Sequence, residues 1–335
     1  MVLSERQVRA GVGLAVLELL ILGGCGPANS PPECSFFSNT CNPTVGPITF
    51  PASAAVFPYR LIVQAGATAV FAVNTTAQQP SYQWQRSADA GQSYVNIAGA
   101  TSSTLTLTNV PLADDATVLR VQVQGAGASL TATAQLLVSS RPGLVYADGD
   151  FQNANWAVDA TVSPLVGGPS HSVDRAAAGG NPAAYRAMVH SLTAGPSTLD
   201  VFHRALAATY DPASLGAIAA IDYTEDCIRQ PTSTLSYGVQ SSLLLEQGSR
   251  RYLAAASDCT ASFWTPMPKS ASLNASAFVL VQGPACTAAE ACPDFGAGGA
   301  LLRFGYARRA TLAAGVAAGT VVHGIDNWQV TVWRR

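Results

Sequence analysis

Short runs of alternating apolar and polar residues are the feature that most constrains the fold of this chain. Between residues 47 and 139, the segments TAVFAV, SYQWQRS and STLTLTNV place apolar residues at every second position. Successive side chains of a strand point to opposite faces of a sheet, so this period is typical of strands with one buried face. Turn residues interrupt it about every eight to twelve residues, which predicts a β-sandwich over residues 47–139.

The same kind of pattern continues after a short linker, SSRPG. The segments RAMVHSL, TLDVFHRALAATY and LSYGVQSSLLLEQ read as strands, and Gly, Pro and Ser separate them. No helical period persists over ten residues of this part of the sequence. We therefore expect an all-β chain in which residues 144–335 form a second, larger, jelly-roll-like sandwich of about eight to twelve strands.

Charge excludes one class of partner. Charged residues make up 11% of the 335 residues and the formal net charge is −2. A nucleic-acid-binding protein needs a basic face to neutralise phosphates, and this composition provides none. We expect no nucleic acid among the partners.

The N-terminus has the organisation of an export signal. Arg6 and Arg9 precede an apolar run, GVGLAVLELLILGG, which ends at Cys25. A basic segment, a short apolar segment and small residues at a cleavage point describe a signal peptide. The four residues Leu22-Gly23-Gly24-Cys25 resemble the lipobox of bacterial lipoproteins. An ordinary secretory signal that happens to contain a cysteine is the alternative.

The lipobox resemblance implies that residues 1–25 are removed up to Cys25 and that this cysteine is acylated. The lipid would anchor the protein in a membrane, and Gly26 after the cysteine favours the outer membrane over the inner one. Residues 26–46, with four prolines among Asn, Ser and Thr, read as a flexible tether between the lipid and the folded part.

Cysteine usage agrees with export. Six cysteines remain after Cys25, an even number in a chain directed to an oxidising compartment. Spacing favours two local pairs and one distant pair, namely Cys34 with Cys41, Cys286 with Cys292, and Cys227 with Cys259. The distant pair would close at one end of a meander formed by residues 217–227, 236–247 and 251–258. Zinc binding is the alternative, but the sequence contains no CxxC.

The first sandwich resembles bacterial immunoglobulin-like domains. The resemblance rests on Gly66, on Tyr82-Gln83-Trp84-Gln85, and on Leu112-Ala113-Asp114-Asp115-Ala116. It implies that Trp84 packs in the core. Val73 and Val121 stand where many relatives carry an inter-sheet disulfide. Domains of this kind serve as spacers, adhesins and enzyme accessories, so the fold does not assign a function.

The two ends of the second sandwich resemble jelly-roll carbohydrate-binding modules of the galactose-binding-like or concanavalin-like kind. The resemblance rests on Gly149-Asp150-Phe151 followed by Trp156, and on Ile325-Asp326-Asn327 near the C-terminus. It implies that the first and last strands lie side by side and that a structural calcium binds near Asp148, Asp150 and Asp326. The alternative is that these aspartates cap turns.

Candidate ligand contacts are few. Trp264 lies in a predicted loop, SFWTPMPK, and Tyr252 on a predicted strand, where burial competes with sugar stacking. The sequence has no GxSxG, HExxH or P-loop motif. Glu225 and Glu246 are the glutamates on predicted strands and the candidate acids of a glycosidase. His190 and His203 read as surface residues or as hydrogen-bonded core residues.

The sequence therefore predicts a cell-envelope protein with a non-catalytic binding role, for a glycan or in adhesion, and no cofactor apart from the possible calcium. Two other hypotheses stay open. One is a structural protein that binds an envelope partner, and the other is an enzyme that acts on polysaccharides.

Overall fold

The computed structural model describes residues 52–335, apart from 165–167, 236–237, 268–269, 288–289 and 291. The predictions for the signal peptide, Cys25, the tether and the Cys34–Cys41 pair lie outside the described residues. Within them the protein is all-β, as predicted, and α1 (Pro212–Leu215) is a single helical turn. No helix in this part of the chain is long and apolar enough to cross a membrane.

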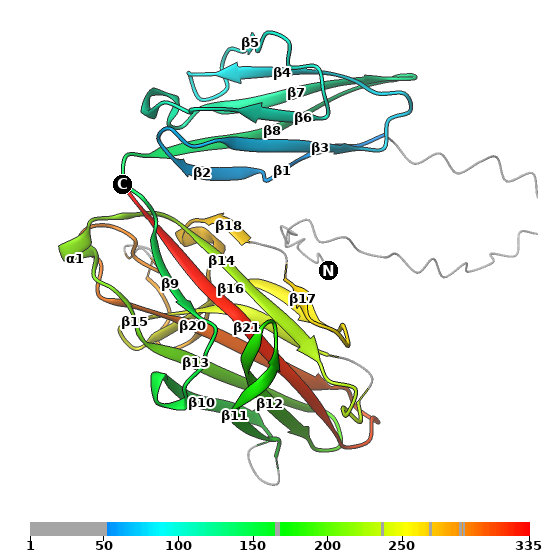
Figure 1. Ribbon diagram of the computed structural model, residues 1–335, viewed down its shortest axis with the longest axis vertical. Helices are drawn as coiled ribbons and strands as arrows, with labels where there is room; N and C mark the ends of the chain where they lie inside the picture. The colour runs from blue at the N-terminus through cyan, green and yellow to red at the C-terminus, as the bar shows by residue number, and fades with distance from the viewer. Residues whose placement is uncertain (1–51, 165–167, 236–237, 268–269, 288–289, 291) are drawn as a thin grey trace, which may run out of the picture. The chain divides into compact units, whose positions relative to one another are not determined.

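The first sandwich has two sheets, drawn in blue to green in Figure 1. The three-stranded sheet has the order β1-β3-β6 and the five-stranded sheet the order β2-β8-β7-β4-β5. The pair β2·β8 is parallel, and the other pairs are antiparallel. The strands are β1 (Ala54–Phe57), β2 (Arg60–Gln64), β3 (Ala69–Thr75), β4 (Ser81–Ser87), β5 (Val95–Asn96), β6 (Thr104–Leu107), β7 (Val118–Gly125) and β8 (Ala128–Ser139).

Alternate residues of these strands fill the core between the two sheets. Trp84 is fully buried, and its indole N–H donates to the carbonyl of Ser102 at 2.9 Å. Val73 and Val121, from opposite sheets, are buried in the same cluster as Phe71 and Leu119. Trp84 is therefore a core residue, and apolar packing occupies the positions where a disulfide joins the sheets of other such domains.

The second sandwich also has two sheets (Figure 1). One is six-stranded, with the order β10-β13-β20-β15-β16-β19. The other has the order β11-β12-β21-β14-β17, with β18 added to β14 and β9 to β21. The strands are β9 (Leu144–Asp148), β10 (Trp156–Ser163), β11 (Ser170–Gly180), β12 (Ala183–Leu192), β13 (Ser197–Tyr210), β14 (Ile218–Arg229), β15 (Val239–Gln247), β16 (Arg250–Cys259), β17 (Thr265–Pro266), β18 (Ser270–Leu273), β19 (Val279–Gln282), β20 (Leu302–Leu312) and β21 (Gly319–Arg334).

The first and last strands of this sandwich are neighbours, which confirms the prediction from the two ends of the segment. Strand β9 pairs with the C-terminal part of β21, from Asp148 opposite Trp328 to Leu144 opposite Val332. Figure 1 shows β9 beside the red β21. The N-terminal part of β21 pairs with β12 on the same side, and β14 covers its other side.

The two predicted disulfides within the described residues are formed, Cys227 with Cys259 and Cys286 with Cys292. The meander predicted around the first of them is wrong. Strand β14 belongs to the sheet of β21, whereas β15 and β16 belong to the six-stranded sheet. The chain crosses from one sheet to the other after Arg229, so Cys227 and Cys259 face each other across the core with their Cα atoms 6.0 Å apart.

Candidate functional site

The outward side of the six-stranded sheet carries a row of polar side chains that crosses five strands. Directly paired residues of an antiparallel sheet lie on the same face, so the pairing registers define this row. Four strand pairings join its five residues, each residue directly opposite the next. Neighbouring strands lie about 4.8 Å apart, so the row is roughly 19 Å long. Its members are Thr161, Asp200, Arg309, Gln240 and Asp258.

A small apolar floor lies on the same side of the sheet. Phe202, Leu244 and Ala307 form a buried cluster of their own, separate from the core between the sheets. The guanidinium carbon of Arg251 lies 4.8 Å from the centre of the Phe202 ring, a cation–π contact. The Phe202 ring is therefore covered by Arg251 instead of being open to stack on a sugar.

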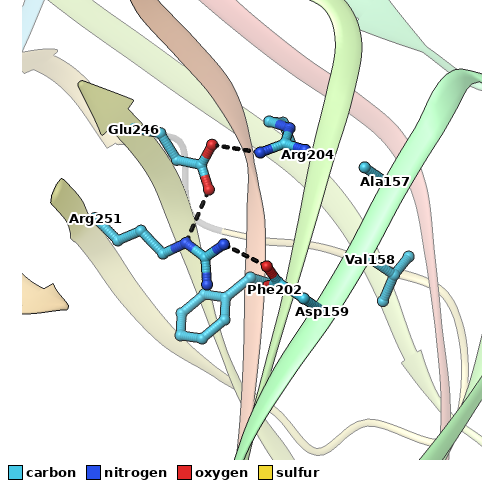
Figure 2. A pocket seen from close by; sticks show the side chains of 7 residues that line it. All are labelled: Ala157, Val158, Asp159, Phe202, Arg204, Glu246 and Arg251. Atoms are coloured by element: carbon cyan, nitrogen blue, oxygen red, sulfur yellow. Dashed lines mark hydrogen bonds and ion pairs between the residues drawn. The ribbon is translucent and has the colours of Figure 1, made fainter. Parts of the chain in front are cut away.

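An ion-pair network lies beside Phe202 of this floor (Figure 2). Glu246 accepts from Arg204 at 2.9 Å and from Arg251 at 2.8 Å, and Arg251 also pairs with Asp159. Together with Phe202, Ala157 and Val158, these side chains line a hollow of about 50 Å³. We call this side of the sheet the outer face and define it by Asp159, Asp200, Arg204, Gln240, Glu246, Arg251, Asp258 and Arg309.

A second hollow, of about 280 Å³, lies at the polar row. Gln240, Asp258, Arg309 and Thr311 line it. Arg309 donates to both carboxylate oxygens of Asp200, at 2.6 and 3.1 Å, and this hydrogen bonding raises the pKa of the guanidinium. The outer face thus offers side-chain acceptors next to guanidinium and amide donors, in arrangements that suit bidentate hydrogen bonds.

The predicted calcium ligands do not converge. Asp148 accepts from the backbone N–H groups of Asp150 and Phe151, at 2.9 and 2.8 Å, and from the indole of Trp156. Asp150 pairs with Arg175 on β11. Asp148 therefore caps the turn after β9, as the alternative interpretation has it.

Asp326, on β21 opposite Asp226 of β14, lies near the Gly149 that joins the other two, with its Oδ1 3.7 Å from where a Cβ on that glycine would stand. It accepts from the backbone N–H groups of Asn181 and Asn327, and its burial raises the pKa of its carboxyl. Among the described residues, no group of three or more His, Cys, Asp or Glu side chains is arranged to hold a metal ion.

The two predicted aromatic contacts have different surroundings. Trp264 is partly exposed, donates its indole N–H to the carbonyl of Gly179, and packs edge-on against Tyr185. Tyr252 is only 1% exposed, which leaves little of its ring for sugar stacking, although it lines a hollow with Arg250 and Glu290, so its contact with a ligand stays a prediction. Alternation along β16 places Tyr252 and Ala254 on the inward side, where both join the core.

The two candidate catalytic glutamates do not share a cleft. Glu246 lies on the outer face, whereas Glu225 points from β14 into the core, where its side chain is fully buried. A pair of glycosidase carboxylates has to flank one substrate bond, and these two side chains lie on opposite sides of a sheet.

The least expected feature of the second sandwich is a polar layer inside its core. We define this polar layer by one inward-facing residue from each of six strands: His190 on β12, His203 on β13, Glu225 on β14, Ser241 on β15, Arg308 on β20 and His323 on β21. An apolar cluster lies on each side of it. On β12, for example, Met188 belongs to one cluster and Leu192 to the other.

Half of the polar layer is joined by an ion pair and hydrogen bonds, although Nε and Nη2 of Arg308 have no hydrogen-bond partner among the described residues. Nη2 of Arg308 lies 3.1 Å from Oε1 of Glu225, and both side chains are fully buried. Glu225 also accepts from the hydroxyls of Tyr223 and Ser241. The buried charges of Arg308 and Glu225 are thus paired and hydrogen-bonded, which is the condition for burying them.

The three histidines of the polar layer lack such partners. Their rings make contacts, since His190 packs edge-on against His323 at 4.5 Å and His203 stacks on Tyr306 at 4.3 Å. Among the described residues, neither nitrogen of any of these rings has a hydrogen-bond partner. The prediction that His190 and His203 are surface or hydrogen-bonded residues is therefore wrong.

Burial of these rings disfavours their charged form. Burial, together with the charge of Arg308 and the proximity of His171, lowers the pKa of His190 to about 3. Burial and nearby positive groups hold the pKa values of His203 and His323 well below the ordinary 6.5. In the folded protein at neutral pH the three imidazoles are neutral.

Comparisons with known proteins extend the description of the first sandwich. Residues 59–141 match a family model described as a domain of unknown function (DUF8696). A search of curated proteins finds no match.

Among solved structures, a marsupial T cell receptor chain is 10% identical, with a TM-score of 0.23, over 46% of this chain and 94% of that one. The N-terminal eight Ig domains of Down syndrome cell adhesion molecule give 16% identity and a TM-score of 0.23, over 47% of this chain and 25% of that one. The all-β fold rests on the strand pairings above and not on these matches.

Proposed function

We propose that this chain is a lipid-anchored protein of the bacterial cell envelope whose second sandwich binds a neutral glycan on its outer face. The observation that carries the proposal is the balance of charges, and the many donors and acceptors, on the outward side of the six-stranded sheet. In this proposal the first sandwich is a spacer between the anchor and the binding domain.

Export is supported independently of the anchor. The two disulfides indicate an oxidising, extracytoplasmic compartment. The lipid anchor itself rests on the lipobox-like residues that end at Cys25. A proline-rich tether of about twenty residues would then give the sandwiches freedom to reach a ligand away from the membrane.

Charge balance argues for a neutral ligand. Four carboxylates and four guanidinium groups lie on this side of the sheet, because Arg303 stands directly opposite Glu246 and joins Arg204, Arg251 and Arg309. An anion would meet the carboxylates of Asp159, Asp200, Glu246 and Asp258, and a cation would meet the guanidinium groups. Neighbouring hydroxyls of a sugar, which donate and accept, match such a surface better than either.

The length and openness of the row favour a chain over a single small molecule. Both hollows lie on the outward side of the sheet, in contrast to the enclosed pockets that take small cofactors, and the smaller one is mainly polar. The row of about 19 Å would contact several sugar units placed across the strands.

A screen of the full chain against immobilised neutral and acidic glycans tests this proposal. We expect binding to neutral glycans of several units, with no gain from added carboxylate or sulfate groups. Binding only to acidic glycans would contradict the argument from charge balance. A complete lack of glycan binding, with capture of an envelope protein instead, would favour the partner-binding alternative.

A further inference from the structure

The polar layer divides an otherwise apolar core, and nothing in the proposed glycan binding uses it. Sheets of a sandwich normally present apolar side chains to each other, and each buried polar group without a hydrogen-bond partner destabilises the fold. Six strands each contribute one polar residue between the same two apolar clusters, so the layer is built by the whole domain. Local rules of packing are broken in this way mainly where a protein has a use for it.

The charges around the three histidines make protonation unfavourable from several sides. Arg308 from β20 lowers the pKa of all three rings, and Arg186 from β12 lowers that of His203. His171, from the neighbouring β11, stands opposite His190, and Arg229 of β14 stands opposite His323.

The other titratable groups packed against the histidines are those of β14 and β20. Tyr306 stacks on His203, whereas Tyr223 and Glu225 are joined to each other, and Glu225 pairs with Arg308. Strand β15 adds the neutral Ser241. Glu225 is thus the one carboxylate in the polar layer, and Arg308 already neutralises it.

A proton added to a histidine of the layer would therefore place an unpaired charge between two apolar clusters. A buried unpaired charge is far more costly than the contacts that hold one imidazole in place. The folded domain avoids this cost either by keeping the histidines neutral or by separating its sheets so that water reaches them.

We propose that the polar layer makes the second sandwich an acid-sensitive switch, in which proton uptake by its three histidines in mild acid opens the core and dismantles the outer face. The link to the outer face is covalent, since Phe202 and Arg204 flank His203 on β13, and Arg309 follows Arg308 on β20. The consequence for ligand release rests on the glycan binding proposed above. The opening of the core does not depend on it.

The sign and size of the effect follow from linkage. The unfolded chain binds a proton at each histidine below the ordinary pKa of 6.5, and the folded one does not until far lower pH, about 3 for His190. Stability is therefore greatest above pH 6.5 and falls with pH below it. Each such histidine lowers the folding equilibrium constant by about tenfold per pH unit, so three approach a thousandfold.

Urea unfolding of the full chain between pH 8 and pH 4.5 tests the switch, with tryptophan emission as the signal, because Trp156 and Trp328 pack in this core. We expect each single replacement, His190→Phe, His203→Phe or His323→Phe, to weaken the pH dependence by about tenfold per pH unit. The matched control is His171→Gln, at the exposed fourth histidine, for which we expect a smaller change. Equal pH dependence in the wild type and in all three phenylalanine variants would overturn the proposal.

A second measurement needs no variant. Nuclear magnetic resonance of protein labelled at histidine reports the titration of each ring while the protein stays folded. We expect the ring of His171, whose pKa partial burial lowers from the ordinary 6.5, to titrate in the folded protein, and the other three to keep the signals of neutral imidazole until the fold opens. A layer histidine that titrates near pH 6 in the folded protein would overturn the switch. Failure of glycan binding alone would leave both results unchanged.

Discussion

Replacement of Arg308 by methionine is expected to destabilise the second sandwich strongly. Arg308 and Glu225 have no exposed side-chain surface, and Nη2 of Arg308 lies 3.1 Å from Oε1 of Glu225. Without the guanidinium, the carboxylate keeps two hydroxyl donors, from Tyr223 and Ser241, but no opposite charge. Loss of one partner of a buried ion pair costs about 3 to 5 kcal/mol. That is a large part of the roughly 5 to 15 kcal/mol that stabilise a typical domain.

A double-mutant cycle separates the ion pair from simple loss of volume. Glu225→Gln removes the charge that Arg308→Met leaves unpaired, so the double variant should regain stability relative to Arg308→Met alone. We expect a coupling energy of about 2 kcal/mol or more between the two sites. The assay is urea denaturation of the full chain at pH 7.5, with the midpoint and the slope fitted together.

The neighbouring residue provides the control for this cycle. Arg309 also pairs with a carboxylate, that of Asp200, but its side chain is 44% exposed. For Arg309→Met we expect a loss of about 1 kcal/mol or less, because solvent screens exposed pairs. Additive effects of Arg308→Met and Glu225→Gln, or a loss from Arg308→Met no larger than that from Arg309→Met, would refute the reasoning about the buried pair.

Two further predictions concern the cysteines. Replacement of Cys227 and Cys259 by alanine should destabilise the protein by roughly 1.5 kcal/mol more than replacement of Cys286 and Cys292, because the first bridge spans 32 residues and the second 6. Equal losses in urea denaturation would contradict the loop-length argument. Cys25→Ser should move the protein from the membrane fraction to the soluble extracytoplasmic fraction, as judged by fractionation of expressing cells. Continued membrane association of this variant would speak against a lipid anchor at Cys25.

Local patterns in the sequence predicted the strands well, and long-range pairing less well. Alternation placed Trp84 in the first core, and the two ends of the second segment predicted the pairing of β9 with β21. The same alternation, taken with chain order, wrongly placed β14 beside β15. Sequence neighbours need not pair, and no local signal marks the crossing between sheets that follows Arg229.

The polar layer had a signal in the sequence that was open to a different interpretation. In Met188-x-His190-x-Leu192, and likewise in Val321-x-His323-x-Ile325, a histidine occupies an apolar position of a two-residue period. The two-residue alternation alone would assign these histidines to the core. A polar side chain in a core usually has a hydrogen-bond partner, which favoured the other interpretation. The structure shows that six polar positions lie between the same two apolar clusters, with Ser241 directly opposite Arg308 and with His190 and His323 two residues out of register.

The outer face was missed for a similar reason. Its arginines and aspartates are scattered over β10, β13, β15, β16 and β20, and single charges on strands usually mean a solvated surface. Cross-strand registers bring them into one row, and sequence spacing does not contain those registers.

The central claim, a glycan site on the outer face, is tested most directly by two matched arginine variants. Arg309→Ala removes a guanidinium from the polar row, and Arg86→Ala removes one from the first sandwich, where Arg86 pairs with Asp114 in nearly the same exposure, 45% against 44%. The affinity of both variants is measured by calorimetry for the neutral glycan that binds best. We predict about a tenfold weaker affinity for Arg309→Ala, as expected from loss of a charged hydrogen bond, and no change for Arg86→Ala. Equal affinities for both variants would contradict the account.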